Sequence, residues 1–150
     1  MSAVTYSNEK IVDFVISNLV PLQVLANAEP IASNFNIKWT PTLITLDSEG
    51  KEHHRTVGFI SPEEFTPSQL LGMAKVNFDL SLFDEALKSL NYLLSEFPRS
   101  KSAPEAIYLR GVCLYKSTHQ AKPLKEAYEK LQAEFPSEEW TQRAYPYRLL

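Results

Sequence analysis

The spacing of apolar and polar positions predicts three successive elements in the first 40 residues. Apolar side chains between residues 11 and 19 recur at helical spacing, with Ser7 as an N-cap and Glu9 as a first-turn acid, which predicts a helix. Residues 20–26 alternate and predict a strand, which Pro21 places at a sheet edge or at the entrance of the strand. Residues 31–35 predict a short helix with Pro30 at its first position.

Two further extended runs predict a hairpin. The apolar residues 43–46 follow Pro41, which cannot donate a ladder hydrogen bond and favours extended geometry at Thr40. Asp47 and Gly50 occupy the first and fourth positions of a type I turn, and residues 52–59 return antiparallel. The apolar run is typical of a central strand covered by helices. From the residues alone, both a trans and a cis Thr40–Pro41 bond remain open.

The second half changes character at Ser61, which predicts a helix start with Pro62 at the first helical position. From about residue 68 onward the spacing predicts helices only, with a last helix from Glu138. The apolar positions of the four preceding helices are Leu70, Leu71, Ala74 and Phe78; Phe83, Ala86, Leu87, Leu90, Leu93 and Leu94; Ala106, Ile107, Leu109, Gly111, Val112 and Leu114; and Leu124, Ala127, Tyr128 and Leu131.

The run Ile37-Lys38-Trp39-Thr40-Pro41-Thr42-Leu43-Ile44 resembles the cis-proline loop of the thioredoxin family. The resemblance covers roughly residues 1–65. It implies that Pro41 is cis and that Thr40 lies beside a substrate-binding face, so Trp39, Thr40 and Pro41 are candidate peptide-binding residues. It also implies that the first core strand and the Cys-x-x-Cys motif would precede Met1.

The resemblance places that strand between residues 20–26 and residues 43–46. Without it the two flanking strands would stand about 9.6 Å apart. Their unpaired backbone groups would cost of order 5–15 kcal/mol, which is the whole stability of a typical domain. We therefore expect residues 20–26 to pair directly with residues 43–46, giving a three-stranded sheet, or a second chain to supply the strand and form a homodimer.

The helical half resembles tetratricopeptide repeats. The Phe-Pro pairs at 97–98 and 135–136 stand 38 residues apart, as do Ala106 and Ala144. Ala86, Pro98 and Gly111 match repeat positions, whereas Ala74 and Pro123 depart from them. If the repeats form a groove, the resemblance implies that Tyr108, Val112, Tyr115 and Lys116 line its inner face, and we take Tyr108, Tyr115 and Lys116 as candidate peptide-binding residues. A plain packing of four helices without a groove is the alternative.

Composition narrows the classes of partner. The chain has 150 residues and a net charge of −3, which gives no electrostatic footprint for nucleic acid or for an anionic membrane. No stretch approaches the ~20 apolar residues of a membrane span, and the N-terminus lacks the pattern of a signal peptide. We expect a cytoplasmic protein that binds no cofactor and whose partner is a protein or peptide.

Candidate chemistry is sparse. Cys113 is the single cysteine, so the chain has neither an internal disulfide nor a Cys-x-x-Cys motif, and its apolar neighbours predict a buried structural thiol. His53 and His54 are neighbours on a strand and point to opposite faces, so they cannot jointly bind one metal ion; they are expected to be exposed polar residues of an edge strand. No catalytic, cofactor-binding or metal-binding residue is assigned.

The sequence thus predicts an α/β unit over residues 1–65, which is a truncated thioredoxin-like sheet of three strands, followed by an all-α segment of tetratricopeptide-like helical hairpins over residues 66–150. The expected function is that of a non-catalytic binding or scaffold protein. The alternative is a fragment of a thiol–disulfide oxidoreductase whose Cys-x-x-Cys lies upstream of Met1.

Overall fold

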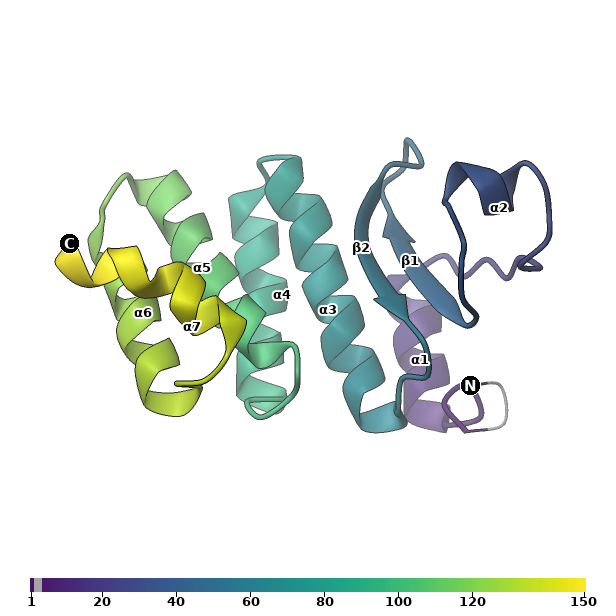
Figure 1. The fold of residues 1–150 in the computed structure, drawn as a ribbon, viewed down its shortest axis with the longest axis horizontal. Helices are drawn as coiled ribbons and strands as arrows, with labels where there is room; N and C mark the ends of the chain where they lie inside the picture. Colours follow the sequence, from purple (N-terminus) through teal and green to yellow (C-terminus); the bar gives the residue numbers. More distant parts are fainter. Residues whose placement is uncertain (2–3) are drawn as a thin grey trace.

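The computed structural model describes Met1 and residues 4–150. Its elements follow one another along the chain as α1 (Glu9–Asn18), α2 (Ile31–Asn34), β1 (Thr42–Leu46), β2 (Glu52–Val57), α3 (Pro62–Asp79), α4 (Phe83–Glu96), α5 (Ala103–Thr118), α6 (Lys122–Glu134), α7 (Glu139–Ala144) and the 3-10 helix η1 (Tyr145–Leu149). Figure 1 shows them in a row, with α2 and the hairpin at one end and α6 and α7 at the other. A small sheet followed mainly by helices agrees with the predicted order.

Helix α1 begins at Glu9, one residue later than a helix capped by Ser7 would begin. Asn8, not Ser7, is the N-cap, because the Asn8 side chain accepts a hydrogen bond from the backbone N–H of Lys10. The buried Ile11 packs with Ile60 and Phe65, and this cluster joins α1 to the start of α3.

The sheet has two strands in the described part of the chain, not three. β1 pairs antiparallel with β2, from Thr42 opposite Val57 to Thr45 opposite His54. The next pair joins Leu46 to Glu52, so His53 has no residue opposite it and forms a β-bulge. The turn closes as predicted, with the Gly50 N–H donating to the Asp47 carbonyl oxygen.

The predicted strand at residues 20–26 is wrong. This segment has no regular structure and pairs with neither strand; Figure 1 shows it running as a loop from α1 to α2. Val20 is 97% exposed and Leu22 82% exposed, so the alternation in the sequence does not correspond to a buried face. Direct pairing of this segment with β1, the first of the two expected arrangements, therefore does not occur in the structure.

Helix α3 lies between the hairpin and the helical half. It runs unbroken from Pro62 across the expected domain boundary at 65/66 and contacts β1 and β2 as well as α4 and α5. Gly72 lets it approach the sheet closely, because a Cβ there would lie 2.7 Å from the Thr45 Oγ1 atom and 3.2 Å from the His54 Cδ2 atom.

The helical half has two adjoining cores. The first holds residues of α3, α4 and α5, among them Leu71, Leu90 and Leu93, which are fully buried. The second joins α5, α6 and α7 through Ile107, Leu131 and Ala144. Successive helices from α3 to α6 are neighbours in space.

Gly111 sets the distance between α5 and α6. A Cβ at this position would lie 2.7 Å from the Ala127 Cβ atom and 3.0 Å from the Pro123 carbonyl oxygen. Neither atom can rotate away, so any larger residue would separate the two helices.

We expect Gly111→Ala to destabilise the protein by about 1–3 kcal/mol, the usual cost of overpacking a core. At an uncrowded helix position, replacing Gly with Ala would instead stabilise the protein by about 0.5–1 kcal/mol. The sign of the change in unfolding free energy therefore shows whether the position is crowded. Urea unfolding measures the change, and Ser117→Ala, on the exposed side of α5, serves as the control with a change within about 0.5 kcal/mol. A stabilised Gly111→Ala variant would contradict the close contact of α5 with α6.

Candidate functional site

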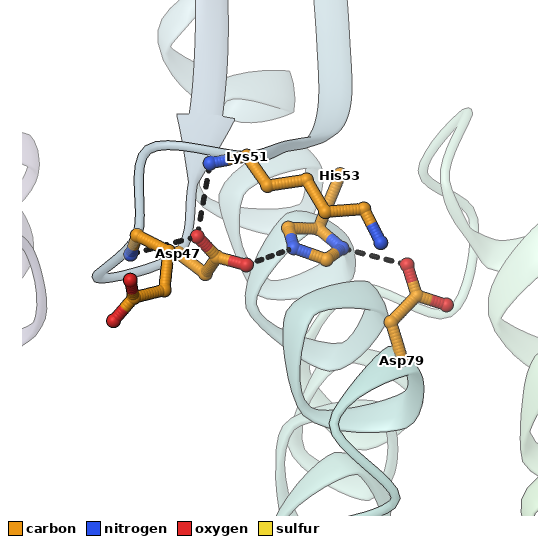
Figure 2. Close-up of polar contacts among 5 residues, drawn as sticks. Asp47, Lys51, His53 and Asp79 are labelled. Atoms are coloured by element: carbon orange, nitrogen blue, oxygen red, sulfur yellow. Dashed lines mark hydrogen bonds and ion pairs between the residues drawn. The ribbon is translucent and has the colours of Figure 1, made fainter.

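Asp47, His53 and Asp79 form a connected cluster where the β1–β2 turn meets the end of α3 (Figure 2). The His53 Nε2 atom lies 2.8 Å from the Asp47 Oδ2 atom, and the His53 Nδ1 atom lies 2.6 Å from the Asp79 Oδ2 atom. The His53 side chain is 1% exposed and that of Asp47 8% exposed. Asp47 is also held by the turn, because its Oδ1 atom accepts hydrogen bonds from the backbone N–H groups of Glu49 and Lys51.

The charges of this cluster support one another. Hydrogen bonding to Asp47 and then to Asp79 raises the pKa of His53, against the opposing effect of burial. The hydrogen bond from His53, followed by the one from the Lys51 backbone, lowers the pKa of Asp47. The arrangement therefore favours an imidazolium between two carboxylates.

The expectation that His53 and His54 are exposed polar residues of an edge strand is wrong. His53 lies in the β-bulge, which changes the direction of its side chain relative to the regular alternation. Both histidines consequently contact α3, His53 through Asp79 and His54 through Ser68 and Lys75.

His54 belongs to a second polar cluster, which lies between the sheet and α3. Its Nε2 atom lies 3.2 Å from the Ser68 Oγ atom, and its Nδ1 atom lies 3.3 Å from the Nζ atom of Lys75. Burial, followed by the charge of Lys75, lowers the pKa of His54 to about 4, so it is neutral near pH 7. Ser68 is 6% exposed and also bonded to Thr56, so this serine–histidine pair is closed to a substrate and holds α3 on the sheet.

The candidate residues Trp39, Thr40 and Pro41 lie in the loop that enters β1, where the Thr40–Pro41 peptide is cis. Trp39 is 67% exposed. With Ala26, Ile37, Lys38 and Thr40 it lines a shallow cavity of about 290 Å³. This loop presents an exposed aromatic side chain beside apolar and backbone groups, a combination suited to binding a peptide.

A larger cavity of about 370 Å³ lies between α4, α5 and α6, and we call it the inter-helix groove. It is lined by Asn91, Leu94, Ser95, Ile107, Arg110, Gly111, Pro123, Glu126, Ala127 and Lys130. The Arg110 Nε atom donates to the Asn91 Oδ1 atom at 2.6 Å, which fixes the guanidinium at the groove. Among Met1 and residues 4–150, no carboxylate forms an ion pair with Arg110.

The candidates Tyr108, Tyr115 and Lys116 share α5 but do not gather with the proline loop, from which α3 and α4 separate them. Tyr108 packs on Trp140, and its hydroxyl lies 3.1 Å from that of Tyr147. Tyr115 and Lys116 are exposed. Tyr108 is thus chiefly a packing residue between α5 and the C-terminal helices.

Cys113 is fully buried, as predicted, and burial raises the pKa of its thiol to about 11. In the described part of the chain, no three histidine, cysteine or acidic residues are placed to hold a metal ion. None of the helices in that part combines the length and the apolar character needed to cross a membrane.

Sequence reasoning missed three functional candidates, namely Asp79, Asn91 and Arg110. Asp79 is 26 residues from His53 along the chain, and Arg110 is 19 residues from Asn91, so no local pattern reveals either pair. The only available signal was His53 itself, a titratable residue close to an acidic turn.

We expect the free energy of unfolding to fall as the pH falls from 6.5 towards 4, in part because of His54. The pKa of His54 is lowered on folding, so in this range only the unfolded chain takes up a proton at this residue. His54→Gln should reduce this slope in urea unfolding measured at several pH values. His119→Asn, an exposed histidine with a left-handed backbone that Asn tolerates, should keep it. Equal slopes for the native protein and His54→Gln would contradict the burial of a neutral His54.

The chain was also compared with known proteins. A family model described as a thioredoxin-like domain matches residues 3–69, which include α1, α2, the hairpin and the first turns of α3. The comparisons with curated proteins and with solved structures found no match. A thioredoxin-like domain is therefore present at residues 3–69 of this chain.

Proposed function

We propose that the protein is a non-catalytic protein-interaction module that binds an acidic peptide segment of its partner in the inter-helix groove. The observation that carries the proposal is the fixed guanidinium of Arg110 beside an apolar floor. Leu94, Ile107 and Ala127 supply that floor. The cavity of about 370 Å³ falls in the usual range of binding pockets, about 300–1,000 Å³.

Charge favours an acidic ligand. The groove lining carries Arg110 and Lys130 against the single carboxylate of Glu126, whereas the chain as a whole has a net charge of −3. Glu126 already lies 3.4 Å from the ammonium group of Lys122, and the ammonium group of Lys130 lies 3.9 Å from Glu134, so both charges are partly offset and Arg110 is the main attraction for a negative ligand. A bidentate arginine–carboxylate contact adds both energy and orientation.

The resemblance to tetratricopeptide repeats is consistent with this role, since arrays of helical hairpins present extended binding surfaces. Tyr115 lies exposed on α5 one helical turn after Gly111 and would extend the contact beyond the groove. Lys116 is also exposed, on the side of α5 that faces away from the groove. The exposed loop at Trp39, Thr40 and Pro41 provides a second peptide-binding surface at the other end of the molecule.

A pentapeptide probe tests the groove. We expect acetyl-Leu-Glu-Leu-Asp-Leu-amide to shift the amide resonances of residues lining the groove, Gly111 and Ala127 among them, and its Gln/Asn counterpart to bind more weakly. Arg110→Ala should weaken binding of the acidic peptide about tenfold, because a charge-assisted hydrogen bond is lost. Arg99→Ala, an exposed arginine outside the groove, should leave it unchanged. Equal affinities for the two peptides, or for Arg110→Ala and the native protein, would contradict the proposal.

A second candidate function is that of part of a thiol–disulfide oxidoreductase, with the Cys-x-x-Cys on a segment upstream of Met1. It is favoured by the thioredoxin-like domain and by the open edge of β1. In the described part of the chain β1 pairs only with β2. An upstream strand would satisfy the free backbone groups on that edge. A strand from a second copy of the chain would do the same and give a homodimer.

The 150-residue chain is expected to lack insulin reductase activity, because dithiol exchange needs two thiols and Cys113 is alone and buried. A turbidity assay measures this, and activity abolished by Cys113→Ser would contradict it. Light scattering distinguishes a homodimer from a monomer. An in-frame Cys-x-x-Cys in the coding sequence upstream of Met1 would establish the oxidoreductase alternative.

A further inference from the structure

We propose that Asp47, His53 and Asp79 form a pH-sensitive latch, which fastens the β1–β2 turn to the end of α3 when His53 is protonated and releases Asp79 when His53 loses its proton. The three side chains come from the turn, from β2 and from the last residue of α3. Figure 2 shows the imidazole between the two carboxylates, with one ring nitrogen directed at each.

The two contacts of His53 with carboxylates require a protonated imidazole. A neutral imidazole has one N–H group and one lone pair, whereas an imidazolium has two N–H groups. Both ring nitrogens of His53 lie within 2.8 Å of a carboxylate oxygen, which cannot donate. Loss of a proton would therefore leave a lone pair facing a carboxylate in a site where the His53 side chain is almost fully buried.

The geometry decides which contact opens. Asp47 is fixed by two backbone N–H groups of its own turn and is 8% exposed. The Asp79 side chain is 44% exposed and, among the described residues, forms no hydrogen bond or ion pair other than the one with His53. Neutral His53 keeps its proton on Nε2 towards Asp47, and Asp79 turns to solvent.

The other charged groups near His53 lie on its own turn and on α3. Asp79 is the last residue of α3, where the negative end of the helix dipole also favours a cation. In the turn, Glu49 and Lys51 contact Asp47 through their backbone N–H groups. On α3, Lys75 faces His54 and pairs with Glu105.

The sign of the effect follows from these shifts. The pKa of His53 is raised on folding, so its stabilisation is complete below about pH 6.5 and is lost as the pH rises through the folded value. The pKa of Asp47 is lowered, so its contribution is complete above about pH 4 and is lost at lower pH. The latch is thus closed from about pH 4 to above pH 6.5, and it opens on the alkaline side.

When the latch opens, the tip of the hairpin loses its contact with the end of α3. The Asp79 contact is made at the end of α3, directly before the turn that leads into α4. Its loss leaves the tip of the hairpin held by its own turn, while the His54 and Ser68 contacts continue to hold the middle of the strand on α3.

Imidazole NMR titration between pH 4.5 and 9 tests the latch in the native protein. The His53 Cε1–H resonance should titrate with a midpoint above 6.5, and amide exchange at Gly50 and Lys51, corrected for intrinsic rates, should accelerate through the same midpoint. A midpoint at or below 6.5, or tip amides whose protection is constant across pH 6–9, would overturn the proposal.

Two variants on α3 separate charge from structure. Asp79→Asn should lower the His53 midpoint by about one pKa unit or more and abolish the pH dependence of tip exchange, and Asp79→Glu should restore both in part. Asp13→Asn, which removes an exposed charge from α1, should leave the midpoint unchanged. A midpoint that moves equally in Asp13→Asn and Asp79→Asn would show a general charge effect and contradict the latch.

Discussion

The close approach of α3 to the hairpin is the constraint on which the rest of the structure depends. A two-stranded hairpin is at best marginally stable alone, so this one needs a covering element. Gly72 allows that element to lie against Thr45 and His54 without a side chain in between. The approach places His54 beside Ser68 and Lys75, and it brings Asp79 within reach of His53.

The adjacent residues His53 and His54 of β2 lie in two polar clusters that shift their pKa values in opposite directions. His54 is buried beside a cation, which lowers its pKa, whereas His53 lies between two carboxylates, which raise its pKa. Adjacent residues differ in this way because the β-bulge at His53 interrupts the alternation of side chains. The result is a strand whose interactions with α3 depend on pH with opposite signs at its two histidines.

Local patterns predicted the helices and the hairpin but not the parts that depend on distant neighbours. Amphipathic spacing located α4 and α6, and the Asp47–Gly50 turn was read from its residue types. Alternation at residues 20–26 was misleading, because a strand needs a partner and none adjoins it in the structure. The bulge at His53 and the Asn91–Arg110 contact arise from register and helix packing, which sequence spacing does not encode.

Because α3 contributes side chains to the core beneath the hairpin and to the core of the helical half, the two halves share a folding unit. Phe65 belongs to one cluster and Leu71 to the other, less than two helical turns apart on the same helix. Unfolding of either core would fray a helix that the other requires, so we expect the two halves to unfold cooperatively. An exchange of gene segments after residue 65 would leave the first turn of this helix on one product and residues 66–79 on the other, and each product would have to supply the missing part.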